Sequence, residues 1–183
     1  MYQDFMKILA ALKYWNISLD DPSFQNNFQS RKILQKITFI SQTLGINMEY
    51  SFSLYKHGPY CSTLTDDYYY YHDNVPKMST SYKLNKNEKI IFDNMDRDIL
   101  SHSIYEKNTV EFLEAIATIM YFKKNDMALM DDELFEKTKA SKPFISDRII
   151  TIAINTVKQV MFKPEYLTKE IQDEIDMWDK ADD

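Results

Sequence analysis

Six side chains that could bind a metal ion or act in catalysis fall within a short stretch of the sequence. They are His57, Cys61, Asp66, Asp67, His72 and Asp73. A cysteine nucleophile needs a histidine base beside it, and a metal site needs three or four converging ligands. A helix that begins near Ser62 would place Asp66 and Asp73 on one face and His72 on another, so the spacing does not bring these groups together. We therefore predict that the chain is not an enzyme, and that it has no catalytic residues, no metal site and no cofactor.

Four consecutive tyrosines, Tyr68, Tyr69, Tyr70 and Tyr71, belong to the same predicted helix. Consecutive helix residues point about 100° apart around the axis, so four rings in a row cannot all enter one core. Exposed tyrosines are favoured at protein interfaces, because the ring adds apolar contact area and the hydroxyl adds a hydrogen bond. We predict that this run contacts a partner protein. The alternative is that two rings are buried and two simply line the surface.

The composition narrows the class of protein. With 183 residues, 44% of them hydrophobic and 27% charged, the chain is long enough for one domain with a sizeable core. Its two glycines, Gly45 and Gly58, are too few and too far apart for the glycine-rich loops that bind nucleotide phosphates. This scarcity also disfavours sandwiches and barrels, which use glycine in their turns, and it favours a mainly helical fold.

The expected location follows from three further features. Cys61 is the single cysteine, which excludes an internal disulfide and a cysteine-based zinc site and fits a reducing compartment. Residues 1–13 do not resemble a signal peptide, because Asp4 and Lys7 interrupt the apolar stretch. No apolar run reaches the roughly 20 residues needed to span a bilayer. We expect a cytoplasmic protein that does not bind a membrane.

Apolar residues at helical spacing predict a series of helices. These cover residues 2–15, 28–44, 62–73, 86–100, 108–125, 131–139, 146–162 and 164–180. Gly45 is expected to end the second helix, because glycine tolerates the left-handed conformation found at many helix ends. Ser62 and Ser146 are expected N-caps, and Asn108 with Glu111 forms a capping-box-like start.

Alternating polarity over residues 48–55 is the best strand signal in the chain. The predicted inner face of this strand consists of Met48, Tyr50, Phe52 and Leu54. Residues 57–59 end the strand, and residues 78–84 would form a second short strand that pairs with it. These patterns predict a mainly α (α+β) fold, in which a helical bundle carries a small two-stranded ribbon.

The segments 108–125, 131–139 and 146–162 have the lengths and short turns of a trihelical, winged-helix-like C-terminal part, with the last segment as recognition helix. Its predicted contacts to bases or phosphates are Arg148, Thr151, Asn155 and Lys158. Asp147 at the start of that helix would repel phosphate, and Pro164 begins another helix where a winged-helix protein has its hairpin. A helix-turn-helix DNA-binding transcriptional regulator is therefore the alternative function, and DNA the alternative partner.

The most distinctive pattern in the chain is an R-x-x-L-Q-K helix followed by an aromatic strand and a Y-x-x-G-P-Y turn into a helix. Its residues are Arg31, Leu34, Gln35, Lys36, Tyr55, Gly58, Pro59, Tyr60, Leu64 and Asp67. In this order they resemble the Panacea-domain family of phage and bacterial antitoxins and the related YwgA-type proteins of bacteria and archaea. The stretch from Leu113 to Ser146 is more similar to the YwgA-type branch, and Cys61 stands where the family has serine.

The resemblance covers well over half of the chain. It implies a helix-rich fold, sometimes described as winged-helix-like, with regulatory or antitoxin roles and no established catalytic residues. For the antitoxin branch, it implies that a partner protein is neutralised by direct contact. We therefore predict a non-catalytic regulatory or protein-interaction module.

The motif residues also have a predicted structural role of their own. Gly58 and Pro59 would make a sharp turn between the strand and the following helix. Gln35 is the polar residue of its helix that is hardest to explain by exposure, and we predict that it hydrogen-bonds the backbone of this turn.

The acidic residues are unevenly distributed along the chain. Residues 165–183 hold eight acids and two lysines and so carry the whole net charge of −6, whereas the rest of the chain is neutral. We expect one compact domain over residues 1–183, or two lobes at 1–84 and 85–164, followed by an acidic C-terminal helix at 165–183. This segment would shield a basic face of its own chain, dock a basic partner, or simply improve solubility. The oligomeric state stays open.

Overall fold

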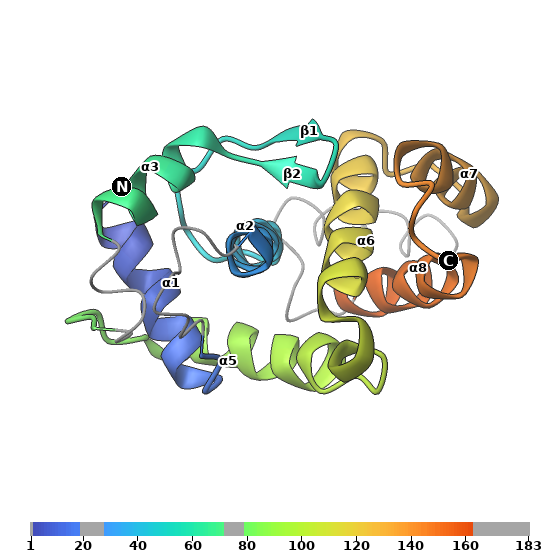
Figure 1. Cartoon of the computed structure of the whole chain (residues 1–183). Coiled ribbons are helices and arrows are strands. Elements are labelled where there is room, and N and C mark those ends of the chain that lie inside the picture. Colours follow the sequence, from blue (N-terminus) through green and yellow to red (C-terminus); the bar gives the residue numbers. More distant parts are fainter. Residues whose placement is uncertain (1, 19–27, 72–78, 163–183) are drawn as a thin grey trace.

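The computed structural model describes residues 2–18, 28–71 and 79–162 (Figure 1). In chain order the elements are α1 (Tyr2–Tyr14), α2 (Phe28–Thr43), β1 (Ser53–Tyr55), β2 (Gly58–Tyr60), α3 (Ser62–Tyr70), α5 (Lys86–Met95), the π-helical turn η2 (Asp96–Leu100), α6 (Tyr105–Asn125), α7 (Asp131–Ser141) and α8 (Asp147–Met161). The fold is mainly helical with one small antiparallel sheet, which confirms the predicted class. His72, Asp73, the helix expected after Pro164 and the acidic segment 165–183 lie outside the described residues.

Two of the predicted helix ends are confirmed. Gly45 follows α2 with a φ of +104°, in the left-handed region that only glycine adopts without strain. Ser146 caps α8, because its Oγ accepts a hydrogen bond from the Ile149 N–H at 3.3 Å.

Two other predicted helix starts are wrong. Cys61, not Ser62, holds the N-cap position of α3. Helix α6 begins before Asn108, and Asn108 (φ −141°, ψ 40°) breaks the helical geometry inside it. The capping box forms instead at the start of α5, where Asn85 Oδ1 accepts from the Glu88 N–H and Glu88 Oε2 accepts from the Asn85 N–H, both at 2.9 Å.

The small ribbon forms between different residues from those expected. Strand β1 pairs antiparallel with β2, with Tyr55 opposite Gly58, so the ribbon is a local hairpin. Residues 79–84, the described part of the expected partner strand, form no strand. Gly58 and Pro59 lie inside β2 rather than in the turn. A two-residue hairpin turn closes a much shorter loop than a pairing with residues 78–84 would, and therefore costs less chain entropy.

Helix α2 runs through the middle of the molecule (Figure 1), with α1, the hairpin, α6 and α5 around it. It packs against α6, which in turn packs against α8, and β2 lies against both α2 and α6. Because neighbours surround α2 on several sides, polar residues of this helix are buried together with its apolar stripe. Among them are Gln35, Lys36 and Thr38. Two of these polar residues, Gln35 and Lys36, lie where α2 meets the hairpin and the start of α3.

Candidate functional site

Gln35 joins the central helix to the start of α3. Its Nε2 donates to the Cys61 carbonyl oxygen at 2.9 Å, and its Oε1 accepts from the Cys61 N–H at 3.0 Å. Nε2 also donates to Thr65 Oγ1 at 3.1 Å. Gln35 hydrogen-bonds the backbone between the second strand and the following helix, as predicted, but its partner is Cys61 and not the Gly58-Pro59 pair. A single buried amide side chain thus satisfies both backbone groups of the residue that caps α3.

Lys36, the next residue of α2, holds the second strand of the hairpin. Its Nζ donates to the Pro59 carbonyl oxygen at 2.7 Å, and its side chain is buried. Burial removes water from the ammonium group and lowers the pKa of Lys36 to about 7, although the nearby Glu114 carboxylate favours the charged form. The lysine therefore anchors the hairpin at a cost in solvation.

Lys142, at the end of α7, holds the hairpin from the other side. Its Nζ donates to the carbonyl oxygens of Tyr55 and Lys56 at 2.8 and 2.9 Å. Burial lowers the pKa of Lys142 from its ordinary value, and Glu114 again opposes the shift. The turn of the hairpin is consequently fixed to α7 as well as to α2.

Glu114 of α6 is the acid that balances these lysines. It is fully buried, with Oε2 3.6 Å from Lys32 Nζ and Oε1 3.8 Å from His57 Nδ1. Burial raises the pKa of Glu114, and Lys32, Lys36 and Lys142 act against this rise. Sequence reasoning missed this residue, since a glutamate is almost never predicted to be fully buried. The only signal is that apolar residues flank it on both sides.

Gly58 lies where these side chains meet the hairpin. Its φ is +83°, and a Cβ there would lie 3.1 Å from Lys36 Cε and 3.2 Å from Thr118 Oγ1. We predict that Gly58→Ala lowers the free energy of unfolding by about 2–3 kcal/mol, because the strained backbone and the crowding of Lys36 both add to the cost. Urea denaturation followed by circular dichroism measures this change.

Gly45→Ala is the matched control for this substitution. Gly45 also has a positive φ, but its Cβ would meet only Ile91 Cδ1 at 3.7 Å, an ordinary van der Waals distance. We expect it to cost about 1 kcal/mol, which is the backbone contribution alone. Equal losses for the two variants would show that the contacts of Gly58 with Lys36 and Thr118 are unimportant.

A cavity of about 400 Å³ opens between the N-terminal half of α2, the hairpin and α3. The aromatic side chains that line it are Phe28, Tyr55, Tyr60, Tyr68 and Tyr69. The cationic side chains that line it are Arg31, Lys32, Lys36 and Lys56, and His57 lies among them. Of all the residues that line the cavity, six belong to the distinctive sequence pattern, namely Arg31, Gln35, Lys36, Tyr55, Gly58 and Tyr60. The pattern therefore builds both the support of the hairpin and the wall of the cavity.

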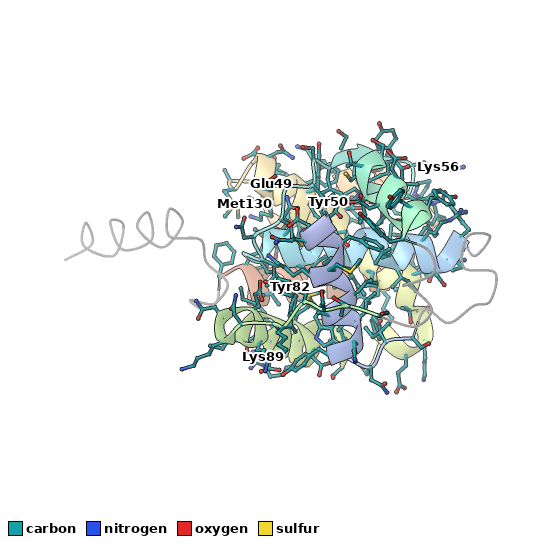
Figure 2. The ribbon with its side chains drawn as sticks, turned by 90° about the vertical axis from the view of Figure 1, so that its left-hand side faces the viewer. Glu49, Tyr50, Lys56, Tyr82, Lys89 and Met130 are labelled. Carbon is teal, nitrogen blue, oxygen red and sulfur yellow. The ribbon has the colours of Figure 1, made fainter. Side chains whose placement is uncertain are left out.

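Positively charged side chains contact aromatic rings at this cavity. Lys32 Nζ lies 5.2 Å from the ring centroid of Phe28, and Arg31 donates to the Tyr69 hydroxyl at 2.5 Å. Lys56 lies at the hairpin turn and extends outward at the edge of the molecule (Figure 2). Desolvation lowers the pKa of His57, and the positive charges of Lys32, Lys56, Lys36 and Lys142 add to this shift. The site is therefore electropositive.

The four consecutive tyrosines have different environments. Tyr68 is 2% exposed and belongs to the core, whereas Tyr70 is 79% exposed. Tyr69 lines the cavity, and Tyr71 is half-buried and stacks on Phe5 with ring centroids 5.6 Å apart. The turn of the helix points the ring of Tyr68 into the core, where it forms part of the cavity wall, and contact of the four tyrosines with a partner stays a prediction. The exposed rings of the run are Tyr69 and Tyr70.

The catalytic candidates that the structure describes, His57, Cys61, Asp66 and Asp67, do not form one site. Cys61 is buried, and Asp66 is exposed on α3. Asp67 accepts a hydrogen bond from the Tyr50 hydroxyl at 2.7 Å. In the described part of the chain, the contacts of His57 are to Glu114, Phe28 and Phe144 rather than to Cys61.

No group of three histidine, cysteine or acidic side chains that could hold a metal ion occurs among the described residues. The described helices likewise include none that is both long enough and apolar enough to cross a membrane.

The chain matches no protein-family model, no curated protein and no solved structure. The resemblance to Panacea-domain and YwgA-type proteins therefore stays a prediction from the residues of the helix-and-turn pattern.

The proposed recognition helix, α8, presents Arg148, Thr151, Asn155 and Lys158 on its exposed face. Carboxylates lie close to both ends of this face. Lys158 Nζ lies 2.8 Å from Asp131, and Asp147 at the start of α8 pairs with Lys139 at 2.8 Å. These acids would repel a phosphate backbone at both ends of the helix.

Proposed function

We propose that the chain is a regulatory module that binds a partner protein and has no catalytic activity of its own. Its binding site would be the cavity between α2, the hairpin and α3. The observation that carries this proposal is the convergence of exposed rings from three elements, represented by Phe28, Tyr55 and Tyr69, on a cavity lined with cations. Exposed aromatic patches that include arginine are typical of protein interfaces.

The charge of the site indicates the kind of partner. Arg31, Lys32, Lys36 and Lys56 line the cavity, and none of the lining residues that the structure describes is acidic. Complementary charge steers association and excludes partners of the wrong sign. The partner would therefore offer an acidic segment, with an apolar or aromatic side chain that fills the cavity.

The buried polar groups support binding rather than chemistry. Gln35, Lys36 and Lys142 all donate to backbone carbonyls of the hairpin or of the residue after it. They fix the shape of the cavity wall and thereby reduce the cost of ordering it when a ligand binds. A direct-contact regulator of the kind that the sequence resembles would use such a preformed surface.

Selection of random peptides displayed on phage against the full chain tests this proposal. We expect the selected peptides to be rich in aspartate and glutamate and to contain an aromatic residue. Lys56→Glu should weaken their binding about fivefold or more, measured by fluorescence anisotropy. Lys89→Glu is the matched control, because Lys89 is an exposed lysine on the opposite side of the molecule (Figure 2). Peptides that are not acidic, or that bind both variants equally well, would contradict the proposal.

DNA binding through α8 is the less favoured function. Asp131 forms an ion pair with Lys158, and Asp147 forms one with Lys139, so these lysines are already paired with carboxylates. Titration of labelled duplex DNA at low and high salt separates the two functions, because phosphate contacts lose affinity steeply as salt increases. Salt-dependent DNA binding that is lost in Arg148→Ala would favour the regulator that acts on DNA.

A further inference from the structure

The cavity has a candidate occupant within the same chain. We propose that the acidic C-terminal segment, residues 165–183, binds the cavity of its own chain and competes there with the partner. This inference rests on the proposed function, because it assigns a regulator to the same site. The segment lies outside the described residues, and its charge and aromatic content follow from its sequence.

Charge complementarity is the first argument. The segment has a net charge of −6, and the rest of the chain has equal numbers of acidic and basic residues. On the folded surface, the cavity gathers Arg31, Lys32 and Lys56, with the buried Glu114 as the acid beside them. An excess of positive charge at the cavity thus meets the excess of negative charge that the chain itself carries.

The segment and the cavity also match in their aromatic side chains. Tyr166 and Trp178 stand among the acids of the segment. The cavity offers exposed rings at Phe28 and Tyr55, on which such side chains can stack. A segment that carries both acids and aromatic rings matches a cavity that carries both cations and aromatic rings, whereas a purely acidic solubilising segment would not need the rings.

The chain beyond α8 is also long enough to reach the cavity. The described structure ends at Phe162, directly after α8. An extended chain advances about 3.3 Å per residue, so the following 21 residues span up to about 70 Å. A domain of this size has a radius of gyration of about 16 Å, or a diameter of about 40 Å, so the part of the segment that carries Trp178, 16 residues after Phe162, is long enough to reach the cavity. Tethering also gives the segment an effective concentration near the millimolar range, so even weak binding would occupy the cavity.

The test uses a synthetic, fluorescein-labelled peptide with the sequence of residues 165–183. It is added to the full chain and to a neutral-tail variant, in which the eight acids of the segment are replaced by asparagine or glutamine. We expect the peptide to bind the neutral-tail variant about tenfold more tightly than the full chain, whose own segment competes. Adding Lys56→Glu to the neutral-tail variant should weaken binding about fivefold or more, and Lys89→Glu should not. A peptide with its own acids neutralised should bind neither protein.

Two results would overturn the inference. One is that the labelled peptide fails to bind the neutral-tail variant, and the other is that Lys56→Glu leaves its binding unchanged. If acidic peptides from the phage selection still bind in a Lys56-dependent manner, only this inference fails and the proposed function stands. If those peptides also fail to bind the neutral-tail variant, the cavity is not a site for acidic segments and both proposals fail.

Discussion

Gln35→Ala should lower the free energy of unfolding by about 2–4 kcal/mol. The substitution removes the acceptor of the Cys61 N–H and a donor to the Cys61 carbonyl oxygen. A buried backbone group left without a partner costs about 1–3 kcal/mol, and the missing side chain leaves a small void. The carbonyl oxygen keeps a hydrogen bond from the Thr65 N–H at 3.3 Å, so most of the loss comes from the N–H group. Urea denaturation followed by far-ultraviolet circular dichroism measures the change.

Two further variants separate the causes. Gln159→Ala makes the same chemical change at an exposed position of α8 and should alter stability by less than about 0.5 kcal/mol. Gln35→Met keeps most of the side-chain volume without the hydrogen bonds, so it should retain only the part of the loss due to the unpaired backbone. If Gln35→Ala stays within 0.5 kcal/mol of the natural protein, the join between α2 and α3 does not depend on this amide.

Loss of the Gln35 contacts should also affect the cavity. Tyr60 and Thr65 line it on either side of Cys61, and the hydroxyl of Tyr60 accepts from Thr65 Oγ1 at 2.9 Å. Since Gln35 fixes Cys61, it holds both neighbours in place. A stability defect at this residue is therefore expected to accompany weaker binding of acidic peptides.

A backbone partner for Gln35 could be predicted from the sequence, because a polar residue in the middle of an apolar helical stripe needs one. That this partner is Cys61 rather than the glycine-proline pair could not be predicted. The burial of Glu114 could not be predicted from the sequence. Helical periodicity assigns α6 one apolar face, but α6 lies between α2 and α8, so its neighbours enclose the glutamate as well. Burial by three-dimensional packing leaves no mark on the periodicity of a single helix.

The hairpin shows a second limit of sequence reasoning. The alternation of residues 48–55 predicts the buried side chains correctly in its first half, where Met48 and Tyr50 are in the core, whereas Phe52 and Leu54 of the predicted inner face are only half-buried. It does not predict the partner strand, because alternation specifies a face and not a pairing. The pairing depends on Gly58 at a φ of +83° and on the lysines that bind the carbonyl oxygens around the turn. Lys142 is 86 residues away from Lys56 in sequence, so no local pattern connects them.

Lys36→Met should remove much of the pH dependence of stability between pH 7.5 and 9.5. The pKa of Lys36 is about 7 in the folded chain, against an ordinary value of 10.5. Between these values the unfolded chain binds a proton that the folded chain has released, so the folded state gains stability as pH increases. The gain approaches about 1.4 kcal/mol per pH unit and totals about 2.5 kcal/mol over this range. The variant lacks the titrating group and should lose that gain.

Other groups define the range in which this effect can be measured. Burial also lowers the pKa of Lys142, which acts in the same direction as Lys36 and leaves some slope in the variant. Burial raises the pKa of Tyr68 to about 12. The unfolded chain therefore releases this proton first, and the free energy of unfolding decreases because of Tyr68 only above about pH 10. Desolvation lowers the pKa of His57 from its ordinary value of 6.5, so His57 titrates below the range.

The measurement is the free energy of unfolding by urea at pH 7.5, 8.5 and 9.5, for the natural chain, for Lys36→Met and for Lys89→Met. The exposed control should follow the natural chain, with stability increasing toward pH 9.5, whereas the Lys36→Met curve should be flatter by about 1 kcal/mol or more per pH unit. Parallel curves for Lys36→Met and the natural chain would mean that Lys36 keeps its proton in the folded state. In that case the ammonium group would be better compensated by Glu114 and the Pro59 carbonyl than its burial indicates.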